Sequence, residues 1–220
     1  MSELWEVLTE HLPEFSSGLW VTIRLVAIAF VIAMVVGTLV AALRVAPVRW
    51  LNRVGGIYVE TFRNVPLLVL LIIAFSGFPR AGVSVGQWVA GMSCLGLYTA
   101  AYIAEALRSG VFAVGKGQVE AALSLGLTYP RTMRRIILPQ AFRTVIPALS
   151  SLVIAMIKNS AIVGGSLVAL PDLLKQTREV QADTAQPDEV YFWGAVGYLL
   201  LTVTATVAFR YLERRFAIRR

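Results

Sequence analysis

A chain of 220 residues with 57% hydrophobic residues, 15% charged residues and a mean hydropathy of +0.72 is too apolar for a soluble globular domain. The formal net charge is +7, but the 20 Lys and Arg are scattered between apolar runs, which excludes the continuous basic face of a nucleic-acid-binding domain. The single cysteine, Cys94, and the single histidine, His11, exclude an internal disulfide and any metal site built from several of these residues.

Residues 1–18 are acidic and predict a short helix at the outer boundary of a membrane. They contain no Lys or Arg, whereas a signal peptide begins with positive charge. An interfacial helix has one apolar side, which is formed here by Leu4, Trp5, Leu8 and Leu12. The acidity of this segment favours the side of the membrane away from the cytoplasm.

Five apolar stretches follow, and each is long enough to cross a hydrocarbon core of about 30 Å. Pro66 predicts a kink in the second stretch, Gly77 to Gly82 predict a tight turn, and residues 169–189 predict a polar loop. The sequence therefore predicts an all-α membrane protein with a transmembrane domain over residues 19–210 and a basic tail over residues 211–220. The expected spans are residues 19–43, 57–75, 84–107, 144–167 and 190–209.

The positions of Lys and Arg predict the orientation of these spans. Nearly all of them lie after the first span, in the central segment of residues 108–143, or at the C-terminus. Cytoplasmic loops carry an excess of Lys and Arg, so the N-terminus is expected outside and the C-terminus inside.

The central segment interrupts the apolar pattern with a helix, a glycine break and a second helix. Glu120 is expected near a helix start, where it complements the helix dipole. Ala121 and Ala122 are small enough to let the helix approach a socket closely, and Gly126 permits the turn. Arg131, Arg134 and Arg135 keep the segment out of hydrocarbon. The sequence therefore predicts a helical hairpin at the membrane surface.

The spacing within this segment carries a family resemblance. Its key positions are Glu120, Ala121, Ala122, Gly126, Ile136, Leu138 and Pro139. The pattern resembles the cytoplasmic loop of permease subunits from binding-protein-dependent ABC importers. The resemblance implies a type I ABC importer permease fold, in which a coupling helix from this loop sits in a groove of the ATPase. The alternative is an ordinary amphipathic cytoplasmic hairpin.

Further stretches resemble the polar-amino-acid branch of these permeases, among them residues 58–68, 101–110 and 138–143, and residues 44–48 and 62–66 resemble actinobacterial glutamate-uptake permeases. This resemblance implies a bacterial cytoplasmic (inner) membrane location and glutamate as substrate, with glutamine, arginine or histidine as alternatives. The implied partners are a dimer of ATPase subunits, a second permease subunit that is identical or paralogous, an extracytoplasmic solute-binding protein, the amino acid and membrane lipid, with no nucleic acid. It also implies that this chain is not an enzyme and holds no cofactor, because ATP and Mg²⁺ are bound by the ATPase.

Lys158 lies well inside the fourth span, where a charge costs about 3 kcal/mol and therefore needs a cavity or a partner. One interpretation is that Lys158, Asn159 and Ser160 line a polar pathway and contact a substrate carboxylate. The other is an ion pair between Lys158 and a glutamate of a neighbouring helix. The family often has Lys-Asp-Thr-Ser at this place, so Asn159 makes the site more positive and favours an anionic ligand.

Charges near the inner ends of the second and third spans predict an ion-pair network or inner gate. Charges near helix ends are cheaper to hold than charges at mid-membrane. The expected members are Glu60, Arg63, Asn64, Glu105 and Arg108.

Two other function classes are considered, a passive amino-acid channel and a membrane-embedded enzyme. The sequence contains no Gly-x-x-x-x-Gly-Lys-Ser/Thr motif, and its carboxylates are too dispersed to indicate an acid–base pair. A channel would conduct without nucleotide, which separates it from an ATP-driven importer.

Overall fold

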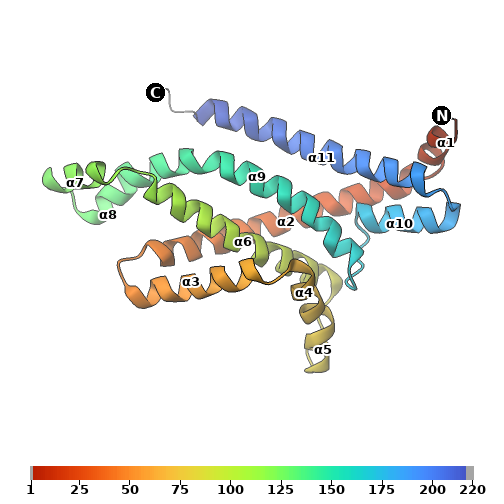
Figure 1. Ribbon diagram of the computed structural model, residues 1–220, viewed down its shortest axis with the longest axis horizontal. Coiled ribbons are helices and arrows are strands. Elements are labelled where there is room, and N and C mark those ends of the chain that lie inside the picture. The colour runs from red at the N-terminus through yellow and green to blue at the C-terminus, as the bar shows by residue number, and fades with distance from the viewer. Residues whose placement is uncertain (1, 217–220) are drawn as a thin grey trace.

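Long apolar helices make up most of the described chain, which is residues 2–216 of the computed structural model (Figure 1). The described residues form helices and turns, with no strand among them. The elements are α1 (Ser2–Glu10), α2 (Leu12–Val45), α3 (Arg49–Asn64), α4 (Leu67–Ile72), the π-helical η1 (Ile73–Gly77), α5 (Phe78–Arg80), α6 (Gln87–Phe112), α7 (Lys116–Ser124), α8 (Tyr129–Thr132), the π-helical η2 (Met133–Ile137), α9 (Leu138–Gly165), α10 (Leu173–Thr184) and α11 (Pro187–Phe216).

Three of these helical segments are long and apolar enough to cross a membrane, namely Leu12–Val45, Tyr129–Gly165 and Pro187–Arg215. The number rises to four when the bent pair of α3 and the segment Leu67–Arg80 is counted as one span. The third expected span, residues 84–107, falls on α6, which is not among them. α6 packs between α2 and α9 and buries Gly91, Gly96 and Thr99, so it needs less apolar surface toward lipid. A count of five spans remains a prediction.

The core is a close contact of α2 with α6. On α2, Leu25, Ala29, Ala33 and Gly37 recur at every fourth residue and are buried, which makes one continuous face. Small residues let the two backbones approach, since a Cβ added at Gly37 would lie 2.9 Å from the Ala100 carbonyl oxygen. α9 then packs on the other side of α6.

The second expected span is broken at Pro66. α3 and the helical segment after it meet at 98° across this break, because proline cannot continue the backbone hydrogen bonding of the preceding helix. The kink expected there is confirmed, as a break. The expected turn from Gly77 to Gly82 is corrected, since Gly77 to Arg80 are helical and the chain turns only at Ala81 and Gly82, where Gly82 has φ +85°.

The N-terminal segment differs from the expectation for residues 1–18. α1 ends at Glu10 and the long helix α2 already begins at Leu12. α1 also packs on α11, where Trp193 Nε1 donates a hydrogen bond to the Leu4 carbonyl at 2.6 Å and Val7 is buried. Contacts with α11 therefore hold α1 in place, in addition to any contact that α1 makes with a membrane surface.

The stretch expected as a polar loop over residues 169–189 contains the helix α10. Asp172 caps its N-terminus, because its Oδ1 accepts a hydrogen bond from the Lys175 amide at 2.9 Å. Leu173, Thr177 and Val180 are buried against α2, α9 and α11. Packing against these three helices therefore stabilises α10, although its many charged residues predict a loop in the sequence.

The two ends of the bundle differ in charge. The C-terminal part of α11, the connection between α2 and α3, and the α7–α8 hairpin lie toward one end, and α1 and α10 lie toward the other (Figure 1). The first end carries the basic clusters of the sequence, at Arg49, Arg53, Arg131, Arg134, Arg135, Arg210, Arg214 and Arg215. We call it the basic end.

Candidate functional site: the hairpin at the basic end and the groove between α3, α6 and α9

The segment from α7 to η2 folds as the helical hairpin that the sequence predicts. α7 ends in a Schellman motif, in which the Gly126 amide donates to the Leu123 carbonyl and the Leu127 amide donates to the Ala122 carbonyl. Gly126 has φ +81°, a conformation that other residues adopt only at a cost. The return limb is held to α7 by Gln140, whose Nε2 donates to Gln118 Oε1 at 2.6 Å.

The hairpin presents apolar side chains away from the bundle. Leu125 is 83% exposed, and Leu123 and Tyr129 are each 44% exposed. A single exposed apolar residue needs no explanation, but three at one tip, on a segment flanked by arginines, mark a contact surface. Ile136 is half-buried, and Leu138 and Pro139 are exposed at the start of α9.

Two details of the expected hairpin are corrected. Glu120 lies in the middle of α7, four residues after Lys116, and not near the helix start, so the helix dipole is not its main partner. Ala122 is only 2% exposed and packs inside the hairpin, which leaves Ala121 and Glu120 as the exposed members of that motif.

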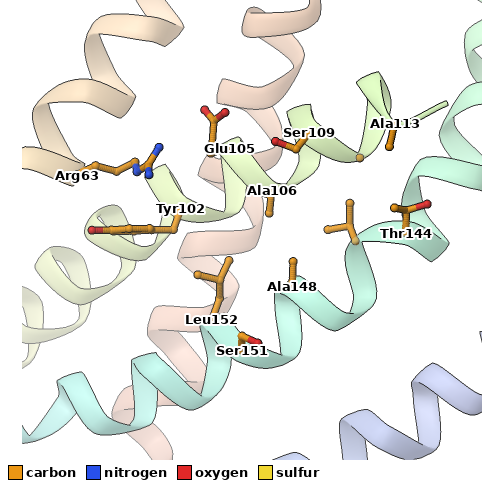
Figure 2. Close-up of a pocket in the computed structure, with 12 residues that line it drawn as sticks. Arg63, Tyr102, Glu105, Ala106, Ser109, Ala113, Thr144, Ala148, Ser151 and Leu152 are labelled. Carbon is orange, nitrogen blue, oxygen red and sulfur yellow. The ribbon is translucent and has the colours of Figure 1, made fainter. Parts of the chain in front are cut away.

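A groove runs between α6 and α9 and is closed at one side by α3. Its volume is about 550 Å³, and Figure 2 shows Arg63 over Tyr102 on one side and Ala148, Ser151 and Leu152 of α9 on the other. Small side chains keep the groove open, among them Ala106 and Ser109 of α6 and Ala113 directly after it. A polar pocket of about 400 Å³ adjoins it and shares Arg63, Tyr102 and Glu105 with it.

Glu105 is the centre of an ion-pair cluster in this pocket. Its carboxylate accepts hydrogen bonds from Arg108 Nη2 at 2.6 Å and from Arg44 Nη1, which lies on α2. The pair of Glu105 and Arg108 agrees with the expected network, and Arg44 is a member that sequence reasoning missed. Arg63 instead places its guanidinium 5.3 Å from the Tyr102 ring centroid, a cation–π distance.

The remaining expected members of the network do not join it. Within the described part of the chain, Glu60 and Arg63 form no ion pair, and Asn64 is exposed. The expected network is therefore corrected to a triad of Arg44, Glu105 and Arg108. Glu60, Arg63 and Asn64 line the adjoining polar pocket instead.

Lys158, Asn159 and Ser160 do not share one face of α9. Lys158 is exposed and Asn159 is half-buried, whereas Ser160 is fully buried, donates to the Ile157 carbonyl at 2.7 Å and contacts Tyr198 of α11. Lys158 has no ion pair within the described residues, so the alternative of a glutamate partner from a neighbouring helix of this chain is not met. Lys158 follows Ser151 by seven residues, which puts both on the groove side of α9.

A buried polar cluster at the other end was not expected. Asp172 is 0% exposed, and its Oδ2 accepts a hydrogen bond from the Tyr198 hydroxyl at 3.4 Å. Burial raises the pKa of this carboxyl to about 6. The next amide, that of Leu173, donates to Thr22 Oγ1 at 3.0 Å. Asp172 therefore ties α10 to α11, with α2 and α9 packed around it.

These features have counterparts in known proteins. The family model described as the binding-protein-dependent transport system inner membrane component matches residues 19–218. The chain belongs to this family. A probable glutamine ABC transporter permease protein, GlnM of Bacillus subtilis, is 39% identical over 209 residues, which cover 95% of this chain and 96% of that protein.

Other relatives carry different substrate names. The glutamate transport system permease protein GluC of Corynebacterium efficiens is 36% identical and covers all of both chains. Further relatives that are 30–33% identical are named as glutamate/aspartate, L-cystine and arginine permeases. A crystal structure of an amino acid ABC transporter with histidines superposes with a TM-score of 0.89 at 35% identity, over 94% of this chain and 96% of that one.

The protein is therefore a permease subunit of an amino-acid ABC importer with the type I fold. In these systems the ATPase is a separate subunit, and the family implies both an ATPase and a substrate-binding partner. Membership also assigns the chain to an inner membrane.

Proposed function

We propose that this subunit imports glutamate or its amide glutamine, with glutamate favoured, and that the α7 hairpin transmits the work of ATP hydrolysis. The observation that carries the proposal is the apolar tip of Leu123, Leu125 and Tyr129 on the helical hairpin at the basic end of the bundle. An exposed apolar surface flanked by arginines suits a protein socket better than it suits lipid or water. The socket belongs to the ATPase subunit.

The charge asymmetry supports an orientation with the hairpin and the C-terminus inside and the N-terminus outside. The arginine clusters lie at the end that carries α7, and the acidic α1 lies at the opposite end. In this orientation the solute-binding protein delivers the amino acid near α1 and α10. The substrate then passes Lys158 before it reaches the groove between α6 and α9.

A second permease subunit completes the pathway. Only 6% of the apolar window of α11 is buried within this chain, compared with 39% for α2, so most of α11 is left for lipid or for the second subunit. The exposed groove side of α9, with Ser151 and Lys158, is likewise open in one subunit. Two subunits facing each other across this side enclose a central path.

The choice of substrate rests on charge and on the relatives. Lys158 favours a carboxylate along the path, and Asn159 adds no negative charge beside it. Relatives named for glutamine and for glutamate match the full length of the chain or nearly so. Glutamate and glutamine share the α-carboxylate and differ only in the side-chain group.

The test is amino-acid uptake into proteoliposomes that contain the full complex, with ATP supplied to the ATPase side. Replacing Glu120→Ala or Leu125→Ser is expected to lower uptake per ATP hydrolysed at least tenfold. Leu167→Ser is the matched control, because Leu167 is 63% exposed and follows the C-terminal end of α9, which lies away from the α7–α8 hairpin (Figure 1). Unchanged coupling in both hairpin variants would refute the role of the hairpin, and uptake without ATP would indicate a channel.

A further inference from the structure

The polar pocket beside the groove contains two charges that the protein leaves unpaired. Its wall is formed by α2, α3 and α6, and Glu105 in this wall is already neutralised by Arg44 and Arg108. Glu60 and Arg63 also line the pocket, are both exposed, and form no ion pair with each other or with another described residue. One helical turn separates them on α3, so they lie on the same side of that helix.

The pocket also contains further groups that suit an anion. Arg63 is held over the Tyr102 ring, which fixes the guanidinium at the boundary between the pocket and the groove (Figure 2). The Nε–H donor of Arg44 is buried without a hydrogen-bond partner in the described chain. A buried donor without a partner costs free energy, and Arg44 adds a second guanidinium to the wall of the pocket.

We propose that this pocket is an inner binding site for the amino acid before its release, distinct from the position of Lys158. Arg63 binds the α-carboxylate and Glu60 binds the α-ammonium group. The side chain extends into the groove of about 550 Å³ that continues from Arg63 along α6 and α9. The ligand class is therefore an L-α-amino acid with a free α-carboxylate and a free α-ammonium group. The side chain of the ligand contributes little to the selectivity of this site.

The charges, volumes and position each support this assignment. Opposite charges one turn apart match a zwitterion, whose carboxylate and ammonium are also close together. The two adjoining spaces, of about 400 and 550 Å³, lie in the range of sites that hold small molecules. The inference rests on the proposed function, since the ligand is the transported amino acid.

The test measures equilibrium binding of radiolabelled L-glutamine and L-glutamate to the full permease–ATPase complex in nanodiscs, without the solute-binding protein. Arg63→Gln and Glu60→Gln are each expected to weaken binding at least about tenfold, the usual effect of losing one charge-assisted hydrogen bond. Arg53→Gln is the matched control, because Arg53 is an exposed arginine of the same helix that lies outside the pocket wall.

Two analogues separate binding from a general loss of structure. N-acetyl-L-glutamine lacks the ammonium group and L-glutaminamide lacks the α-carboxylate. In the wild type each is expected to bind at least about tenfold more weakly than L-glutamine. The preference over N-acetyl-L-glutamine should vanish in Glu60→Gln, and the preference over L-glutaminamide should vanish in Arg63→Gln.

The outcomes distinguish this site from the proposed function. Binding that is unchanged in both variants, but lost in Lys158→Gln, would overturn the inner site and leave import intact. The inner site would also be overturned, and import left intact, if the wild-type complex bound no amino acid while ATP-driven uptake was normal. Analogue preferences that vanish as expected would support the site even if uptake in the variants were lost.

Discussion

Gly164→Ala should destabilise the protein strongly, because the last turn of α9 leaves no room for a methyl group. A Cβ added at Gly164 would overlap Oδ1 and Cγ of Asp172 and would lie 2.7 Å from its Oδ2. The carboxylate would have to leave its position. It would then lose the hydrogen bond from the Lys175 amide that caps α10 and the bond from the Tyr198 hydroxyl.

The magnitude follows from these two effects. Loss of an N-cap costs about 1 kcal/mol, and forcing an extra methyl group into a packed site costs about 1–3 kcal/mol. The expected loss in free energy of unfolding is therefore about 2–4 kcal/mol, or roughly 5–15 °C in Tm for a chain of this size. Thermal unfolding of the purified subunit in one detergent would measure it.

The adjacent glycine supplies the control. A Cβ added at Gly165 would lie no closer than 3.2 Å to a neighbour, and that neighbour is the end of the Leu174 side chain. Gly165→Ala should therefore change Tm by no more than a few degrees. If Gly164→Ala unfolds within 2 °C of the wild type, the buried cluster around Asp172 does not hold α10 as described.

Three further predictions concern charge and backbone conformation. Burial raises the pKa of Asp172 from 3.8 to about 6, so the folded state favours the protonated carboxyl and the free energy of unfolding falls as the pH rises from about 4 through 6. Asp172→Asn keeps an acceptor for the cap and cannot ionise, so its free energy of unfolding should match that of the wild type at pH 4 and exceed it at pH 8 by about 2–3 kcal/mol. Glu105→Gln should lower the free energy of unfolding by about 2 kcal/mol because it leaves Arg44 and Arg108 without their carboxylate, whereas Glu179→Gln, which breaks the exposed pair with Lys175, should cost under about 0.5 kcal/mol in the same denaturation assay. Gly126→Ala forces a side chain into φ +81° and should cost about 1 kcal/mol locally, seen as faster amide exchange at Leu127, while a rate equal to the wild type would contradict it.

Local sequence patterns predicted the hairpin and the long helices well. Gly126 and the residues around it lie within ten positions of one another, so their spacing alone fixes the turn and the helix that precedes it. Pro66 likewise acts on its own helix. Apolar length located α2, α9 and α11, although it missed their ends by several residues because helices continue beyond the hydrocarbon.

Local sequence patterns do not predict contacts between segments that lie far apart in the chain. Arg44 and Glu105 are 61 positions apart, and nothing in either neighbourhood indicates the pair. The sequence predicts a loop in place of α10, because the charged residues of this helix hide its buried side of Leu173, Thr177 and Val180. The grouping of Lys158 with Ser160 failed for a simpler reason, since two positions on a helix point to nearly opposite sides.

The central claim, that the hairpin sits on the cytoplasmic side against the ATPase, is tested most directly by cysteine accessibility. In a Cys94→Ala background, Leu125→Cys and Leu167→Cys are treated with a membrane-impermeant maleimide in right-side-out vesicles that contain the full complex. Leu167→Cys should be labelled in intact vesicles, and Leu125→Cys only after the membrane is permeabilised and the ATPase removed. Labelling of Leu125→Cys in intact vesicles, or equal labelling of it with the ATPase bound, would contradict the account.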